Sequence, residues 1–233
     1  MPISSDITAL PSPGGSDISL CLVDLDAHPD AWDASVLSAD ERARAARFRF
    51  EVHARRYQAS HVALRQILGQ ATGSNPASLR FTEGLHGKPR LAQAGAPQFN
   101  MSHSAGWALV GWCPSHPLGV DIEIVTPMDD ADLLAQRHFS ATEYAAFGRT
   151  PPDHRLEAFF RCWTRKEACL KALGSGLSIE PCEFEAGMGQ EDQRTFIAVA
   201  GQACHMRVGC IELSIPGQAA FARLDDADSP LAM

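Results

Sequence analysis

The chain has 233 residues, of which 45% are hydrophobic, and its 20 basic and 28 acidic side chains leave a formal net charge of -8. A mean hydropathy of -0.12 is ordinary for a globular protein with one substantial core or two smaller ones. No run approaches the roughly 18 apolar residues of a membrane-spanning helix, and the acidic balance argues against nonspecific nucleic-acid binding.

Cysteine usage argues against a disulfide framework and a thiolate zinc site, and histidine usage gives little support for a histidine-based zinc centre. The seven cysteines are an odd number without a CxxC pair, and the nine histidines include no HExxH spacing. We therefore expect reduced thiols, mostly in the core. The N-terminus lacks a charged start followed by an apolar block, so we expect no secretory signal and a cytoplasmic protein.

The first part of the chain predicts a tail, a strand and a helix start. Residues 1–16 are rich in Ser, Pro and Gly without periodicity, so we expect a flexible tail. Residues 17–26 predict a first strand. Ser38 and Glu41 then form a capping box, in which Ser38 accepts from a free amide and Glu41 reaches back, and this predicts the start of a helix.

An arginine-rich stretch follows between residues 40 and 65. It carries seven arginines against three acids, a local balance of 7 - 3 = +4. These arginines are Arg42, Arg44, Arg47, Arg49, Arg55, Arg56 and Arg65. A solvated helix face is the commoner explanation, but guanidinium groups are also natural partners of phosphate because they bond its oxygens in pairs. Apolar positions over 62–68 predict a second helix that closes before Gly69 and Gly73.

The next segments present polar side chains outside the apolar pattern. Residues 79–82 predict a short strand, and residues 84–89 predict a turn that presents Lys88. Residues 96–104 predict a loop carrying Ser102 and His103, ahead of an apolar strand at 107–112. A histidine beside a serine is a weak signal for nucleophilic catalysis, because no acid that would orient it is identifiable. A hydrogen-bonded loop histidine is the commoner case.

Residues 117–125 form a β-branched run that predicts a strand with two acids on one face. Val120, Ile122 and Ile124 share the other face, which leaves Asp121 and Glu123 roughly 7 Å apart along the strand. An amphipathic strand with a wet acidic face is one interpretation. The other is a cation between the two acids, because like charges side by side repel.

Residues 155–176 predict a helix with one acid on its apolar stripe. Ser140 and Glu143 form a capping box for the helix before it, which two prolines end. In the later helix Glu167 lies where the period calls for a hydrophobe, with Lys171 one turn on. A surface pair of Glu167 and Lys171 is one interpretation. A third carboxylate beside Asp121 and Glu123 is the other, and such a set suits a hydrated Mg²⁺ with open positions for phosphate.

The C-terminal part predicts an antiparallel sheet from short alternating segments at 183–186, 195–199, 205–213 and 218–224. The fold class is therefore α+β. We expect a flexible tail (1–16), an N-terminal half (17–118) and a C-terminal half (119–233), with a ligand in the seam between the halves.

Four motifs together resemble one enzyme family. The motifs FNMSHS, GVDIE and WTRKEACLKALGSG occur in this order with a GKP upstream, and the match runs from about residue 38 to 176. This pattern resembles the 4′-phosphopantetheinyl transferases, specifically the larger two-half type that serves peptide and polyketide synthases. The resemblance implies two similar halves related by pseudo-two-fold symmetry, each with helices packed on a small, mainly antiparallel sheet.

The resemblance also implies a reaction. Phosphopantetheine would pass from coenzyme A to a serine of an apo acyl or peptidyl carrier protein, with Mg²⁺ as cofactor and adenosine 3′,5′-bisphosphate as the released product. Asp121, Glu123 and Glu167 match the metal-binding carboxylates, and Glu167 also matches the proposed base for the carrier serine. Lys171 and Lys166 match lysines near the pyrophosphate.

The coenzyme A contacts follow from the same resemblance. His103, Arg56 and Arg44 match contacts to the 3′-phosphate, while Lys88 and Ser102 match residues that line the coenzyme A site. The sequence departs from the family at Glu41, where relatives can carry a basic residue, and residues 1–16 have no obvious counterpart.

Two other functions are open at this point. One is a catalytically silent coenzyme A-binding regulatory module, against which the presence of all three carboxylates and Lys171 argues. The other is a metal-dependent phosphoesterase that needs no carrier. We expect a monomer, because the two halves can build the cleft within one chain.

Overall fold

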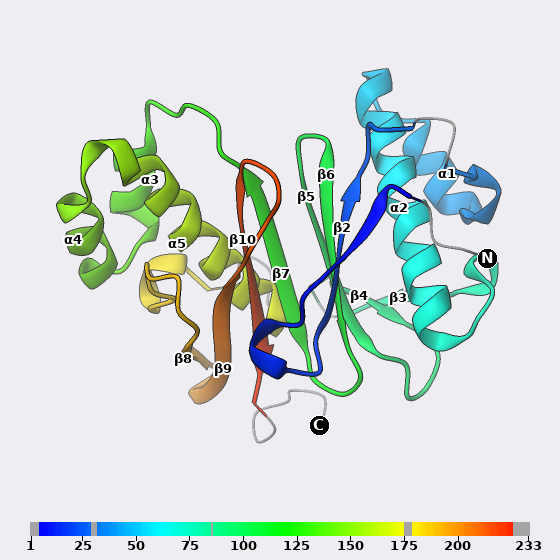
Figure 1. The fold of residues 1–233 in the computed structure, drawn as a ribbon. Coiled ribbons are helices and arrows are strands. Elements are labelled where there is room, and N and C mark those ends of the chain that lie inside the picture. The colour runs from blue at the N-terminus through cyan, green and yellow to red at the C-terminus, as the bar shows by residue number, and fades with distance from the viewer. Residues whose placement is uncertain (1–4, 29–31, 85, 175–178, 226–233) are drawn as a thin grey trace.

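Two four-stranded antiparallel sheets lie face to face at the centre of the structure, with helices on their outer faces (Figure 1). The computed structural model describes residues 5–28, 32–84, 86–174 and 179–225. The first sheet has the order β1-β2-β6-β5, formed by β1 (Ile7–Leu10), β2 (Ser19–Asp24), β6 (Trp107–Cys113) and β5 (Gln98–Ser104). The second has the order β7-β10-β9-β8, formed by β7 (Leu118–Ile124), β10 (Gly217–Leu224), β9 (Gln202–Ile211) and β8 (Gln193–Val199).

The remaining elements lie outside these sheets. A separate hairpin pairs β3 (Phe81–Glu83) with β4 (Pro89–Leu91). The helices are α1 (Ala39–Ala45), α2 (Glu51–Thr72), α3 (Ala131–His138), α4 (Ala141–Arg149) and α5 (Pro152–Leu173). None of the helices in the described ranges is long and apolar enough to cross a membrane.

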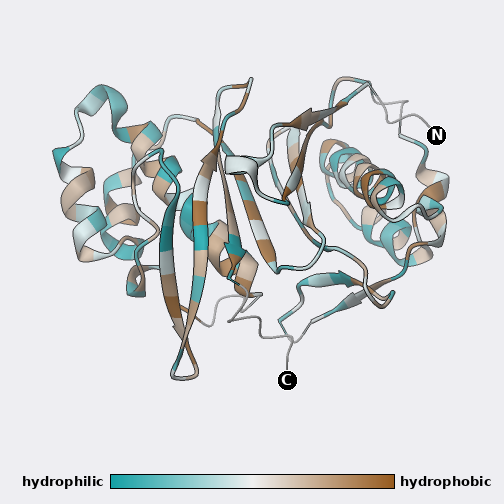
Figure 2. Cartoon of the chain, turned by 60° about the horizontal axis from the view of Figure 1, so that its bottom comes forward, coloured by the Kyte–Doolittle hydropathy of each residue, from teal (hydrophilic) through white to brown (hydrophobic). Residues whose placement is uncertain are grey.

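Apolar alternation along the strands explains the layered core. Leu20 and Leu22 of β2 pack between the sheets, whereas Cys21 and Val23 of the same strand pack against α2. The second sheet repeats this arrangement against α5, and Figure 2 shows apolar and polar positions alternating along the strands. Since neighbouring residues of a strand point to opposite faces, each sheet buries both. The α+β class with helices on small antiparallel sheets is thus confirmed.

The two halves repeat one plan. Each has a first strand (β2, β7), a short helix opened by a capping box (α1, α4) and a 22-residue helix (α2, α5) that ends at a left-handed glycine. Each then places two later strands beside the first, in the matching orders β2-β6-β5 and β7-β10-β9. Two similar halves were predicted and are present. Residues 114–117 link β6 of one sheet to β7 of the other, and we keep the division at residues 118 and 119 as a proposal.

A buried cation holds each half together from the same position in its long helix. In the first half, Arg65 pairs with Glu41 at 2.8 Å, and its Nη1 donates to the carbonyls of Pro76 and Leu79. These bonds tie α2 to the capped start of α1 and to the segment after α2. The Glu41 carboxylate is thereby engaged within the fold.

Lys166 does the same in the second half. It pairs with Glu143 at 2.6 Å and donates to the carbonyls of Pro181 and Phe184 at 2.7 and 2.6 Å. Lys166 is 1% exposed and Glu143 is 2% exposed. Because a buried charge is stable only when paired and hydrogen-bonded, this cluster fixes where α4, α5 and the segment after α5 meet.

Several sequence expectations were wrong. Residues 7–10, predicted as tail, form β1 along β2. Residues 98–104, predicted as loop, form β5, whose alternation was hidden because one of its faces is polar. Residues 183–186 are not a strand, because carbonyls of this segment accept bonds from Arg165 and Lys166 of α5 instead of from a neighbouring strand. The helix α3 was not predicted. Residues 175 and 176 of the predicted long helix and residue 85 of the predicted turn lie outside the described residues.

Gly119 permits the close approach of α5 to β7. A Cβ at this position would overlap the Ala168 carbonyl and the Ala172 amide and would lie 2.8 Å from the Lys171 Cβ. Backbone atoms of a buried helix cannot move aside as a flexible side chain can. Only glycine therefore allows α5 to lie directly on β7.

We predict that Gly119→Ala lowers the free energy of unfolding by about 1–3 kcal/mol or more, because it overpacks the α5–β7 contact. Differential scanning calorimetry measures the change. Gly148→Ala in α4 is the matched control, since no atom lies within 4 Å of its added Cβ and alanine favours a helix. Equal melting temperatures for the two variants would contradict this account of the contact.

Candidate active site

The candidate site begins where the two sheets meet at their edge strands, β5 and β7. These strands pack side by side without a backbone ladder, and side chains of β5 reach across instead. Asn100 Oδ1 accepts from the Val120 amide at 2.8 Å, and Ser104 Oγ accepts from the Ile124 amide at 3.2 Å. Two edge amides of β7, those of Val120 and Ile124, are thus satisfied by polar side chains on one face of β5.

The same face of β5 fixes the two acids of β7. Ser102 Oγ donates to Asp121 Oδ1 at 2.7 Å, and Ser104 Oγ donates to Glu123 Oε2 at 2.7 Å. Both carboxylates are therefore held in place by the other half. The prediction that Asp121 and Glu123 share one face of a strand is confirmed by these contacts, and Val120 and Ile122 pack on the opposite face.

Lys171 joins this group from α5. Its Nζ lies 2.6 Å from Asp121 Oδ1 and donates to Ser102 Oγ at 3.0 Å. Asp121 is 3% exposed, and its Oδ2 is buried without a hydrogen-bond partner. A buried carboxylate oxygen without a donor is costly, so this atom is a natural ligand for a cation.

Glu167 lies one turn before Lys171 on α5 and interacts electrostatically with Asp121 and Glu123. Burial raises the pKa of all three carboxyl groups, and the Asp121 and Glu123 charges raise the pKa of Glu167 further against the Lys171 ammonium. Burial together with like charge disfavours the ionised forms. The group would bind a hard divalent cation well for this reason.

The carboxylate oxygens of Asp121, Glu123 and Glu167 do not all lie within 4.8 Å of one another in this structure. Within the described ranges, the group of three potential ligand side chains whose donor atoms lie within 4.8 Å of one another is Asp17, Cys113 and His116. The Lys171 ammonium holds Asp121 Oδ1. The donor set and the unpaired Oδ2 fit Mg²⁺, which prefers few carboxylates and keeps its own waters.

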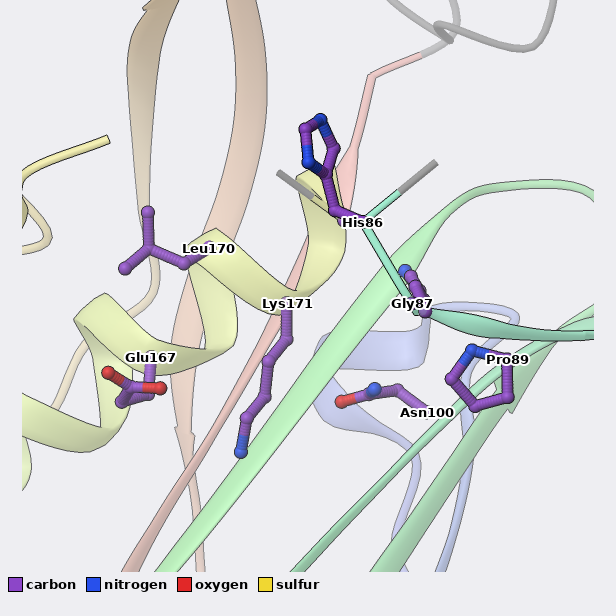
Figure 3. A pocket seen from close by; sticks show the side chains of 9 residues that line it. His86, Gly87, Pro89, Asn100, Glu167, Leu170 and Lys171 are labelled. Atoms are coloured by element: carbon purple, nitrogen blue, oxygen red, sulfur yellow. The ribbon is translucent and has the colours of Figure 1, made fainter. Parts of the chain in front are cut away.

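A cavity of about 290 Å³ opens beside these residues. Figure 3 shows Glu167, Leu170 and Lys171 of α5 on one side and His86, Gly87 and Pro89 of the β3–β4 hairpin on the other, with Asn100 of β5 between Lys171 and Pro89. The first half therefore supplies one wall and the second half the other.

A larger cavity of about 750 Å³ adjoins the first, because Gly87, Pro89 and Asn100 line both. Its far wall is formed by α1 and α2 and includes Arg44 and Arg47. The Arg44 guanidinium lies over the Tyr57 ring, 5.5 Å from its centroid, which orients it. The two cavities form one groove with arginines at one end and Glu167 and Lys171 at the other. Arg47 was noted only as part of the arginine-rich stretch.

Arg56 and His103 are not among the residues that line the two cavities. Arg56 donates to both oxygens of Asp26 and does not line either cavity. His103 is exposed on the face of β5 opposite Ser102 and Ser104. Partial burial of its ring, with the Lys171 charge, lowers its pKa.

Lys88 lines the smaller cavity, but its charged end bonds backbone of the other half. Its Nζ donates to the Leu118 carbonyl at 2.8 Å and to the Ala172 carbonyl at 3.1 Å. Burial, with the Arg90 charge, lowers its pKa to about 7. Lys88 thus fastens the hairpin wall to β7 and to the end of α5.

Lys166, like Arg56, is a predicted site residue that does not line the groove. Its ammonium is enclosed by Glu143, Pro181 and Phe184 on the far side of α5 from Lys171. Its neighbour Arg165 is also fully buried and donates to carbonyls of Ala186, Gly189 and Glu191. Helical period alone could not assign these cations to the core, because their acceptors lie 15 to 26 residues further along the chain.

Two family models match most of the chain in tandem. The model described as 4′-phosphopantetheinyl transferase, N-terminal, matches residues 27–114, and the model described as 4′-phosphopantetheinyl transferase superfamily matches residues 117–211.

Curated relatives carry the same description. The chain is 41% identical over 149 residues to the 4′-phosphopantetheinyl transferase HetI of Nostoc, covering 62% of each chain. It is 38% identical to psf-1 of Bacillus pumilus (68% of this chain, 67% of the relative) and 30% identical to Sfp of Bacillus subtilis (68% and 70%). The matches thus span about two thirds of the relatives' lengths. The crystal structure of Thermotoga maritima holo-[acyl-carrier-protein] synthase is a distant neighbour, with 20% identity, a TM-score of 0.33 and coverage of 48% and 64%.

We predict that Lys166→Met lowers the free energy of unfolding by about 3–5 kcal/mol, because it leaves Glu143 charged and buried. Lys171→Met is the control and should lose less, since Lys171 is 29% exposed at its side chain and Asp121 keeps Ser102. Urea unfolding at pH 7 measures both.

The same variant has a pH signature. Despite burial, Lys166 and backbone amides hold the pKa of Glu143 below its ordinary 4.5. A lowered pKa stabilises the fold above the unfolded-state value and loses that contribution as pH falls through the folded-state value. Wild type and Lys166→Met should therefore converge in acid, and a constant difference down to low pH would contradict the ion pair.

Proposed function

Because the chain belongs to the 4′-phosphopantetheinyl transferase superfamily, we propose that it transfers 4′-phosphopantetheine from coenzyme A to a serine of an apo acyl or peptidyl carrier protein and releases adenosine 3′,5′-bisphosphate. The observation that carries this proposal is the groove between the halves, with arginines at one end and Glu167, Lys171 and Asp121 at the other.

The arginine end suits the 3′-phosphate. Arg44 and Arg47 line the larger cavity, and a guanidinium bonds phosphate oxygens in pairs. Arg56 and His103 belong to the same proposal, with Arg56 exchanging Asp26 for phosphate. Anchoring of this remote group supplies binding energy that orients the pyrophosphate at the reacting end.

The acidic end suits the transfer itself. Asp121, Glu123 and Glu167 would hold Mg²⁺, which when bound neutralises the charge of the pyrophosphate oxygens. Lys171 forms an ion pair with Asp121 and would offset the negative charge on the leaving phosphate. Ser102 fixes the position of Asp121, and Lys88 fixes the wall opposite Glu167.

Glu167 is the proposed general base. Its carboxylate faces the cavity from α5, and its raised pKa brings it nearer to neutral pH than an exposed glutamate. A base of this kind can take the proton of the carrier serine as its oxygen attacks phosphorus. No nucleophile of this chain is needed, because the serine belongs to the partner.

We predict that a carrier protein mixed with the enzyme, coenzyme A and Mg²⁺ gains the mass of one phosphopantetheine, as measured by intact-protein mass spectrometry. Glu167→Gln should slow this gain by about 10²-fold or more because the base is lost. Its melting temperature should not fall, since the substitution removes one of three repelling charges.

A panel of acyl and peptidyl carriers that shows no mass gain would overturn the transferase. Titration calorimetry then separates the alternatives. Coenzyme A binding that ignores both Mg²⁺ and Glu167→Gln would indicate a silent binding module, and product release from coenzyme A without a carrier would indicate a phosphoesterase.

We predict that Arg44→Ala weakens binding of coenzyme A by roughly tenfold or more and leaves 3′-dephospho-coenzyme A almost unaffected, because a charged hydrogen bond to one phosphate is lost. Arg149→Ala at the end of α4 is the matched control, far along the chain from the groove-lining arginines. Equal weakening of both ligands would remove Arg44 from the 3′-phosphate.

A further inference from the structure

A second cluster of metal-ligand side chains lies at the connection between the halves. Asp17 precedes β2, Cys113 ends β6, and His116 stands in the link of residues 114–117 that leads to β7. Cys113 is 0% exposed, whereas Asp17 is exposed and His116 is partly so. A thiol, an imidazole and a carboxylate from three places in the sequence thus converge on one point.

The donor atoms are spaced as ligands of one tetrahedral ion would be. Cys113 Sγ lies 3.3 Å from Asp17 Oδ2 and 3.9 Å from His116 Nδ1, and Nδ1 lies 3.6 Å from Oδ2. Zinc bonds of about 2.3 Å to sulfur and about 2.0–2.2 Å to nitrogen and oxygen require separations of roughly 3.4–3.6 Å. Shifts of a few tenths of an ångström would complete the triangle.

Arg223 of β10 orients the carboxylate of this cluster. It donates to Asp17 Oδ1 at 2.9 Å, so it orients the carboxylate and leaves Oδ2 for an ion, although its Nη1 also lies 3.5 Å from His116 Nδ1. Ser115 Oγ lies 3.0 Å from the same nitrogen. A thiolate and a carboxylate neutralise a divalent ion, and Arg223 stabilises the ligand carboxylate from outside, as outer partners of metal ligands do.

The cluster is separate from the groove. Arg223 pairs with Leu118 at the start of β7, whereas Asp121 and Glu123 lie further along that strand on the face opposite the sheet-to-sheet core. In Figure 1 the start of β7 lies at the lower end of the sheets, beside the short turn of residues 13–15 that precedes Asp17.

We propose that Asp17, Cys113 and His116 bind one transition-metal ion, for which Zn²⁺ has the matching preferences, and that this ion fastens the link between the halves. The mixed S, N and O donor set excludes Mg²⁺ and suits zinc with water as fourth ligand. Binding releases the Cys113 thiol proton to solvent, so one proton leaves for each ion bound. Closely spaced sequence motifs could not reveal this site, because Asp17 and Cys113 are 96 residues apart.

The test titrates the chelator-treated full chain with Co²⁺ and follows the thiolate-to-cobalt charge-transfer band in the near ultraviolet. We expect one equivalent to saturate the band and Zn²⁺ to abolish it by displacement. Cys113→Ser should remove the band, and Cys182→Ser is the matched control because Cys182 is exposed and outside the cluster. Asp17→Asn, a change at an exposed side chain, should weaken Co²⁺ at least tenfold.

Melting temperatures give an independent readout. Zn²⁺ should raise the melting temperature of wild type and of Cys182→Ser but not that of Cys113→Ser. Absence of the band in wild type, its persistence in Cys113→Ser or its loss in Cys182→Ser would overturn the proposal. The metal test does not measure transfer activity. Its failure can therefore be distinguished from a failure of the carrier assay.

Discussion

The structure depends on how two edge strands, β5 and β7, meet without forming a ladder. Each strand lies at the edge of its sheet. Its unpaired backbone amides and its carboxylates would be destabilising if they were buried without hydrogen-bond partners. Asn100, Ser102 and Ser104 supply those partners from one half to the other. The same bonds that close the sheets together also hold Asp121 and Glu123 in place, so assembly and site formation are one event.

The repeated plan of the halves separates structural from chemical side chains. Arg65 and Lys166 hold the same position in the two long helices and bind the same kinds of partner, a capping-box glutamate and carbonyls beyond the helix. Two residues before the end of each 22-residue helix, the two helices carry side chains of different chemistry. Lys171 of α5 corresponds in position to Gln70 of α2. The first half therefore contributes the hairpin wall and the arginines of the groove, and the second half contributes the three carboxylates and Lys171.

Local signals in the sequence predicted much of this fold, and contacts between distant residues account for the rest. Both capping boxes are present, at Ser38 and Ser140, because a cap depends on residues three positions apart. The strand β5 was missed because its polar face is explained only by β7. The family resemblance placed Lys166 near the pyrophosphate. Its burial depends on carbonyls of Pro181 and Phe184, and the helical period does not reveal these contacts. The pairing of Asp121 with Lys171 was not predicted, because the two residues lie 50 positions apart in the chain.

The wall of the groove built by the β3–β4 hairpin belongs to neither four-stranded sheet, although Phe81 and Leu91 of the hairpin pack against the core beside α2. Phe81 also packs edge-to-face on Phe99 of β5, and the Lys88 ammonium donates to two carbonyls of the opposite half. Insertions or exchanges in its connecting turn would leave both hydrophobic cores untouched, because turns tolerate changes of length far better than packed elements do. Changes to the size of the ligand that the groove admits therefore have a natural starting point in that turn, while Glu167 and Lys171 stay as they are.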